Sequence, residues 1–392
     1  MRNKELHENG GLSRGLLYAL ATIAGLSVAN LYYNQPLLHV MGPDLGCGEA
    51  QTARIALLTQ VGYALGLFFI VPLADLYSRR RIITADLGLL VIALLAMALA
   101  PTVGVAWGAS VVIGICSVVP QIFVPLAAQY STPEEKGRNV GIVVSGLLTG
   151  ILASRVVSGA VGELWGWRTM YYVAAGLMVL SAGVMLRVLP PSESNFRGSY
   201  GALMRSLVSL VRTYPALRVY ALRAGLAFGS FMGLWSVLAF RMARAPFFAG
   251  SDEVGALGLC GVAGALTASF IGRLTGRIGV RRLSVVGALM HLVAWGLFFI
   301  ADDTYAGLIA GILVLDIGMQ CVQLGNQTRM FALCPSASNR MNTIFMTAYF
   351  IGGSLGTFVS GSAWVAGGWP GVVLAGAVFS LLSLCCTCCS RY

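Results

Sequence analysis

The sequence predicts an all-α membrane protein with twelve transmembrane helices, arranged in two pseudo-symmetric halves of six helices each. Hydrophobic residues make up 57% of the 392 positions and charged residues only 10%, with a mean hydropathy of +0.80. Soluble domains carry about 25% charged residues, so this composition excludes a water-soluble enzyme, a disordered protein and a DNA-binding protein. The apolar residues also form long runs, and several landmarks recur along the chain.

Each apolar run is long enough for a helix that crosses a bilayer, which needs about 20 residues. The first run follows Arg2, Lys4 and Arg14 and has no convincing cleavage site, so it predicts a transmembrane helix rather than a signal peptide. The predicted spans are 15–38, 52–76, 82–101, 104–129, 140–164, 168–189, 218–242, 253–275, 283–301, 304–331, 340–365 and 370–390.

Basic residues predict which side of the membrane each loop occupies. With the N-terminus inside, the inside segments hold 20 of the 26 lysines and arginines. The outside loops instead hold acids such as Asp44, Glu49 and Asp252. Because cytoplasmic loops carry the Lys and Arg excess, we expect a multi-pass protein of the cell inner membrane with both termini cytoplasmic. Topology thus explains the net charge of +11 without a nucleic-acid partner.

One long loop divides the chain. Residues 190–217 open with Pro190-Pro191, and then Leu203, Leu207 and Leu210 recur at helical spacing. This pattern predicts an amphipathic helix on the cytoplasmic leaflet. We therefore expect an N-terminal six-helix bundle over 1–189, a cytoplasmic linker over 190–217 and a C-terminal six-helix bundle over 218–392.

The two bundles also align as an internal repeat. An even number of spans per repeat predicts two parallel halves, related by an axis along the membrane normal. The landmarks that match are Gly166-Trp167 with Gly368-Trp369, Pro133 with Pro335 and Arg138 with Arg340.

Small residues recur every fourth position in spans 5 and 11. Gly146 and Gly150 belong to the first series, and Gly352 and Gly356 to the second. Such stripes let two helix backbones approach closely. Ordinary static packing is one interpretation. Because the stripes occur at equivalent places in both repeats, we favour the other, that they are sliding surfaces between the two halves and act in gating.

The loop between spans 2 and 3 reads Leu-Ala-Asp-Leu-Tyr-Ser-Arg-Arg-Arg, with Asp75 four residues before Arg79 and five before Arg80. A degenerate copy lies between spans 8 and 9. This pattern resembles the signature loop of the major facilitator superfamily, and the resemblance extends over the whole chain. It implies that Asp75, Arg79 and Arg80 act in gating. On the residues alone, the arginines also satisfy the positive-inside rule.

Within that superfamily the chain resembles the prokaryotic drug/proton antiporter branch, which includes exporters of drugs, sugars and nucleosides. The segment Ala-Asn-Leu-Tyr-Tyr-Asn-Gln-Pro-Leu-Leu at 29–38 resembles one bacterial group there. Two features depart from the branch. Span 4 carries no arginine, and Ile151 follows Gly150 where the branch usually has proline.

The resemblance implies that spans 1, 4, 7 and 10 line a central cavity. The sequence of span 10 supports this independently of the resemblance, because its polar residues recur at spacings of four, three and four and form one stripe along the helix. Polar groups inside a membrane face a cavity or pair with each other, so the glutamines could instead bond neighbouring helices. The residues we expect to bind substrate are Asn30, Tyr33, Asn34, Gln121, Arg223, Gln320, Gln323 and Gln327.

Asp316 is the one acid that the sequence places well inside a span, and Arg155 is a cation at similar depth. Ionisable residues in a membrane are functional candidates. We expect Asp316 to carry a proton as the cavity alternates, with Arg155 as its partner. The rival interpretation is a structural pair of Asp316 with Arg155 or Arg223.

These observations predict a secondary active transporter that exports a small neutral or amphipathic organic compound in exchange for protons. The first alternative is a proton-coupled uptake carrier for a small organic substrate such as a carboxylate, and the second is a non-transporting sensor or scaffold. No ATP-binding loop or catalytic motif is present in the sequence, so we expect no enzyme activity, cofactor or metal site. The expected partners are the substrate, protons and the bilayer, and the protein is expected to be a monomer.

Overall fold

The computed structural model describes residue 8 and residues 10–190, 199–262, 264, 267, 278–301, 303–334 and 337–390, without the side chain of Asp75. Every regular element in these ranges is a helix. The first half contains α1 (Arg14–Ala29), η1 (Gln35–Leu37), α2 (Leu38–Asp44), α3 (Glu49–Phe69), α4 (Leu73–Leu76), α5 (Arg79–Ala98), α6 (Val103–Cys116), α7 (Val119–Tyr130), α8 (Lys136–Trp165) and α9 (Trp167–Val188). The second half contains α11 (Pro215–Met242), α12 (Ser251–Leu257), η2 (Gly258–Cys260), α14 (Val280–Ile300), α15 (Tyr305–Leu333) and α16 (Ser338–Cys389).

The helix count agrees with twelve spans. Nine helices in the described ranges are long and apolar enough to cross a membrane. The 52-residue α16 contains two spans, because Gly368 has non-helical angles (φ 60°, ψ −149°). The segment from α1 to α2 forms the first span, and α12 begins the predicted eighth span, much of which lies outside the described residues.

Proline explains the breaks in spans 1, 2 and 4. Pro36 lies in η1, Pro72 precedes α4, and Pro120 lies in the first turn of α7. Because proline has no backbone N–H and its ring clashes with the preceding turn, the apolar runs that read as continuous in the sequence fold as pairs of shorter helices.

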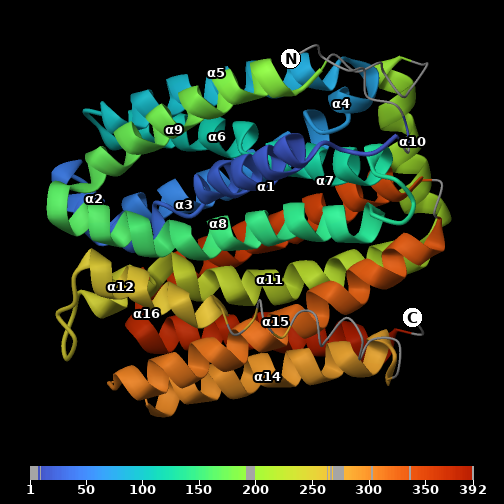
Figure 1. Ribbon diagram of the computed structural model, residues 1–392. Coiled ribbons are helices and arrows are strands. Elements are labelled where there is room, and N and C mark those ends of the chain that lie inside the picture. Colours follow the sequence, from blue (N-terminus) through green and yellow to red (C-terminus); the bar gives the residue numbers. More distant parts are fainter. Residues whose placement is uncertain are drawn as a thin grey trace.

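The linker between the halves contains α10 (Tyr200–Thr213), which buries Leu203 and Leu207 and exposes Val208. Figure 1 shows the long helices running side by side, with α10 at one end of the bundle and α12 at the other. We call these the α10 end and the α12 end. The described chain begins and finishes at the α10 end (Figure 1).

The internal repeat is visible at the glycine–tryptophan landmarks. Gly166 (φ 82°) separates α8 from α9, and Gly368 separates the two parts of α16. A positive φ is accessible to glycine at no steric cost. Each following tryptophan is buried, and its Nε1 donates a hydrogen bond, from Trp167 to Asp44 Oδ2 (2.8 Å) and from Trp369 to the Phe298 carbonyl (2.7 Å). The same sequence device therefore turns the chain at corresponding places in both halves.

Candidate functional site

A buried arginine joins three spans at the centre of the molecule. Arg155, on α8, is 3% exposed, and its Nε donates to Gln35 Oε1 at 2.7 Å. Its guanidinium carbon also lies 4.0 Å from the ring centroid of Trp235 and 5.0 Å from that of Tyr32. Burying a cation is costly unless polar or aromatic groups compensate it. Gln35, Trp235 and Tyr32 provide this compensation, and we call them the arginine cage.

Asp316, on α15, is the buried acid of the same region. It is 8% exposed, and its Oδ2 has no hydrogen-bond partner in the described part of the chain. It is close enough to interact electrostatically with Arg155, but the two side chains form no ion pair. The pair that the sequence suggested is therefore not closed in this structure, and Arg155 is bound by its cage instead.

Glycines of span 8 pack against both of these residues. A Cβ added at Gly258 would lie 2.9 Å from Arg155 Cβ, and one added at Gly264 would lie 3.2 Å from Asp316 Cβ. At Gly261 the same atom would lie 3.9 Å from Asp316 Oδ1. Because these positions carry no side chains, the backbone of span 8 approaches both Arg155 and Asp316 closely.

The predicted polar residues of span 1 contact helices of their own half. The Asn30 amide donates to the carbonyls of residues 26 and 27 and lies 3.7 Å from Met178 Sδ on α9. The Asn34 amide donates to Thr59 Oγ1 at 3.2 Å. Tyr33 is 3% exposed. The amide nitrogens of Asn30 and Asn34 are thus bonded within the first half, whereas their Oδ1 atoms have no hydrogen-bond partner among the described residues.

The glutamines of span 10 lie on a half-buried stripe that faces span 11. Gln323 accepts a hydrogen bond from the Tyr349 hydroxyl at 3.1 Å, and Gln327 donates to Asn342 Oδ1 at 3.0 Å. Gln320, one turn from Asp316, is half-buried. In this conformation the stripe therefore bonds neighbouring helices, as one of the two sequence interpretations proposed.

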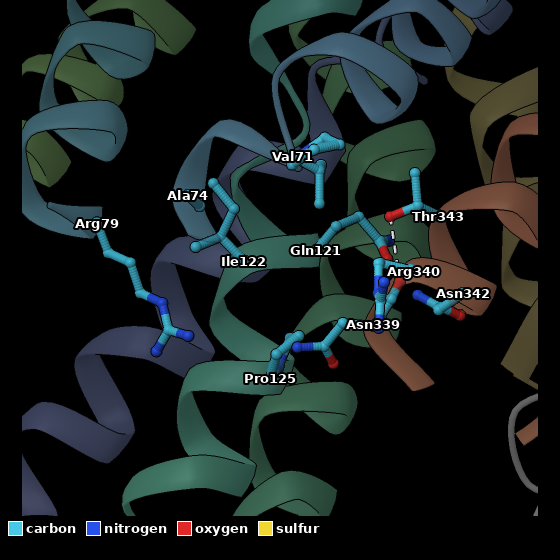
Figure 2. Close-up of a pocket in the computed structure, with 11 residues that line it drawn as sticks. Val71, Ala74, Arg79, Gln121, Ile122, Pro125, Asn339, Arg340, Asn342 and Thr343 are labelled. Carbon is cyan, nitrogen blue, oxygen red and sulfur yellow. Dashed lines mark hydrogen bonds between the residues drawn. The ribbon is translucent and has the colours of Figure 1, made fainter. Parts of the chain in front are cut away.

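A small cavity between the halves opens near the α10 end (Figure 2). Gln121, whose amide donates to the Tyr63 hydroxyl at 3.2 Å, lies between Arg79 on one side and Arg340 on the other. The cavity volume is about 30 Å³, which is room for about one water molecule. This cavity is thus too small for an organic substrate in this state.

The α12 end is held shut by contacts between the halves. Arg244 Nη2 lies 2.8 and 3.0 Å from the two carboxylate oxygens of Glu49, and the Trp364 indole donates to Glu49 Oε2 at 2.7 Å. On the other side, α12 crosses α8 so closely that a Cβ added at Gly255 would lie 3.2 Å from Gly159 Cα. These two contacts clamp both sides of the α12 end.

Comparison with known proteins agrees with this architecture. Residues 20–357 match the family described as Major Facilitator Superfamily. The chain is 39% identical to "Uncharacterized transporter YgaY" of Escherichia coli O157:H7 over 96% of this chain and 95% of that protein. It is 30% identical to "Probable transporter SCO4007" of Streptomyces coelicolor, over 94% and 86%.

The chain belongs to the major facilitator superfamily. It is therefore a transporter of the secondary-carrier type and not an enzyme. Among solved structures, the nucleoside transporter NupG gives a TM-score of 0.76 at 13% identity, over 95% of this chain and 98% of that one. A bacterial homologue of the human lysosomal transporter Spinster, inward-facing and unoccupied, gives 0.72 at 16% identity, over 96% and 95%. At these identities the likeness shows the fold.

The glycine stripes do not lie at the contact between the two halves, where their spacing and repetition predicted them. The expected contact between the halves is wrong for all four glycines, because each packs against a helix of its own half. A Cβ at Gly146 or Gly150 would collide with the backbone of α1, and one at Gly352 or Gly356 with the backbone of α11. A small-residue stripe allows close approach but does not specify the partner helix. The gating role remains a prediction.

The signature loop is placed against the first half. Arg79 is 3% exposed and lies 5.7 Å above the Tyr130 ring, and Arg80 donates to the Leu186 carbonyl. The Asp75 side chain lies outside the described residues. The arginines thus tie the start of α5 to α7 and α9.

Arg223 lies away from the central charges. It is fully buried on α11, its Nη2 donates to Ser390, and its carbonyl accepts from Ser383 at 3.2 Å. Both partners belong to the far end of α16, near the α10 end. The structure therefore separates Arg223 from the other residues that the sequence grouped as substrate-binding.

Sequence reasoning missed an aromatic cluster that fills the centre between the halves. Phe228 stacks on Tyr349 with centroids 3.8 Å apart, and Tyr63 lies 4.3 Å from Phe350. The signal was present on span 7, where Phe228, Phe231 and Trp235 share a face at spacings of three and four. The cluster gives the centre a largely aromatic lining.

A second buried acid also escaped prediction, so Asp316 is not the one acid inside a span. Asp86, on α5, is 7% exposed and interacts with Cys116 of α6. Its Oδ2 has no hydrogen-bond partner among the described residues. It lies eight residues into α5 and could have been found by counting depth from Arg79.

Replacing Glu49 by Gln should weaken the clamp at the α12 end. The side chains of Glu49 and Arg244 are both partly exposed. We therefore expect a shift toward the open form of at most about fivefold, as for a surface ion pair. Spin labels on Leu164 and Phe248, both exposed at this end, would report the distance between the halves. Glu135→Gln, which breaks a pair at the α10 end, is the control. An unchanged distance distribution would show that Glu49 does not hold the clamp.

Proposed function

We propose that this transporter exports a small neutral or amphipathic organic compound in exchange for protons, by alternating access. The observation that carries the proposal is the unpaired carboxylate of Asp316, buried opposite Arg155. A carboxylate in a low-dielectric site is stabilised by taking up a proton or by pairing with a cation. Asp316 can take up a proton, or it can pair with Arg155, which is close enough to interact with it electrostatically.

The exchange between these two possibilities is the coupling step. With a proton on Asp316, Arg155 rests in the arginine cage, as the structure shows it. When the proton leaves, the negative charge attracts Arg155 across the glycine segment of span 8. That movement releases Gln35 and the Trp235 face, which then bind substrate. Loading a proton returns Arg155 to the cage and expels the substrate.

The aromatic lining supports a weakly polar or amphipathic substrate. Phe228, Tyr349 and Phe350 offer apolar faces, and Gln320 and Gln323 offer hydrogen bonds to neutral groups. Binding pockets for small molecules combine apolar walls with a few placed polar groups.

The α10 end is proposed to face the cytoplasm of a bacterial inner membrane. Arg79, Arg80 and Lys136 lie near it, whereas Glu49, Glu163 and Asp252 lie near the α12 end. This distribution follows the positive-inside rule. With the α12 end clamped, the proposal assigns the structure to the part of the cycle that is closed toward the outside.

The proposal predicts substrate-triggered proton movement in liposomes. The purified protein is reconstituted, vesicles are loaded with acid, and internal pH is followed while nucleosides, sugars, amphipathic drugs and carboxylates are added. We expect proton release when one class of compound is added, at a rate about tenfold or more above protein-free vesicles. Proton entry together with substrate would mean symport and would overturn the assignment as an exporter.

A further inference from the structure

A groove of about 230 Å³ lies between span 2 and span 11, toward the α12 end, and no step of the proposed transport cycle uses it. It is bounded by one helix from each half, α3 and α16. Its rim includes the exposed apolar side chains Phe358 and Val365. On a membrane-spanning bundle such side chains face the lipid, so the groove opens laterally into the bilayer.

Apart from Arg54, the polar side chains that line the groove are already hydrogen-bonded. The Thr357 hydroxyl accepts from Gln60 Nε2 at 2.9 Å, and the Ser362 hydroxyl donates to the carbonyl of residue 358 at 2.9 Å. Ala53 and Gly361 supply the rest of the contact between the helices. Since the polar atoms are already satisfied, the groove suits a hydrocarbon chain rather than a polar ligand.

One cation stands at the rim. Arg54 lines the groove, is exposed, and has as its only recorded partner in the described chain the Trp107 ring, 5.4 Å away. Arg54 is the sixth residue of α3, about 7 Å along the helix from its start. The interfacial layer of a bilayer is about 5–7 Å thick on each side. Because a long arginine side chain extends its charged head toward that layer, Arg54 is suited to reach a lipid phosphate. Trp107 fits the aromatic belt at that level.

We propose that this groove binds the acyl chain of a glycerophospholipid, with the lipid phosphate held by Arg54. The charge of Arg54 complements the phosphate, and the satisfied floor complements the chain. Because the groove needs α3 and α16 side by side, the lipid binds the state closed at the α12 end. A ligand that binds one state shifts the population toward it, so this lipid stabilises the clamped form.

Native mass spectrometry of the full-length protein tests the proposal, with phosphatidylglycerol and the phosphate-free lipid monogalactosyl diacylglycerol as probes. Wild type should retain phosphatidylglycerol in preference to the galactolipid. Arg54→Gln should reduce that preference by about fivefold, whereas Arg187→Gln, at an exposed position on α9, should leave it unchanged.

A groove-filling variant separates this site from general lipid coating. Ser362→Phe places a ring in the groove from its exposed rim, and Val179→Phe adds the same ring to an exposed face of α9. Ser362→Phe should lose the retained molecule of either lipid, and Val179→Phe should keep it. Equal retention by the two variants, or an unchanged lipid preference in Arg54→Gln, would overturn the proposal. Neither readout depends on transport.

Discussion

Replacing Asp316 by Asn should abolish proton-driven transport and make substrate binding weak at every pH. Asparagine keeps the size of the side chain but can neither release a proton nor attract Arg155. Arg155 would then stay in its cage with Gln35 and Trp235 at every pH. We expect the acceleration of transport by a pH gradient to fall by about tenfold or more, the usual size of coupling between two ligands.

The measurement is counterflow and pH-driven flux in the same liposomes. Counterflow, which needs no net proton movement, should be weak in Asp316→Asn, because Arg155 keeps Gln35 and Trp235 occupied, and it should no longer depend on pH. The matched control is Asp303→Asn, an acid exposed at the α12 end, which should behave as wild type. If Asp316→Asn keeps the full response to the gradient, the carboxylate is not the proton carrier, and Asp86 becomes the next buried acid to replace.

The fold could be predicted because its causes act locally along the chain. Long apolar runs specify spans, and the recurring Gly-Trp pairs specify the same turn twice, as Gly166 and Gly368 show. The breaks within spans 1, 2 and 4 were not predicted. Hydropathy averages over a window, whereas a single proline such as Pro36 or Pro120 redirects the backbone at one residue.

The site could be predicted only in part. The position of a residue along a span indicates its depth in the membrane, but it does not indicate which side chain of another span will contact it. The depth of Asp316 and Arg155 followed from their positions in spans 10 and 5. The bonds of Arg155 to Gln35 and Trp235 join residues 120 and 80 positions away in sequence, and no periodicity encodes them. The glycine stripes fail as predictions of the interface between halves for the same reason. Spacing shows that a face is flat, but only the tertiary fold decides which helix lies on it.

The close crossing of α8 and α12 predicts the second large effect, from Gly255→Leu. A Cβ at position 255 would collide with the Arg155 carbonyl and lie 3.2 Å from Gly159 Cα. Backbone cannot move aside as a flexible side chain can, so the two helices must separate. Overpacking of this kind costs about 1–3 kcal/mol, which is about a five- to 150-fold shift away from the state closed at the α12 end. Transport should be lost, because alternation needs both closed states.

Spin labels on Leu164 and Phe248 separate this effect from simple misfolding. Gly255→Leu should lengthen the distance between them, and Gly255→Ala should do so less, since the required separation grows with side-chain size. Gly176→Leu is the matched control, because a Cβ there meets no atom within 4 Å. If Gly255→Leu leaves the distance unchanged but lowers transport, the crossing is not the gate, and the leucine acts through its neighbour Arg155. In that case Gly159→Ala, on the opposite face of the same crossing, should leave the pH dependence intact, whereas Gly258→Ala, beside the Arg155 stem, should alter it.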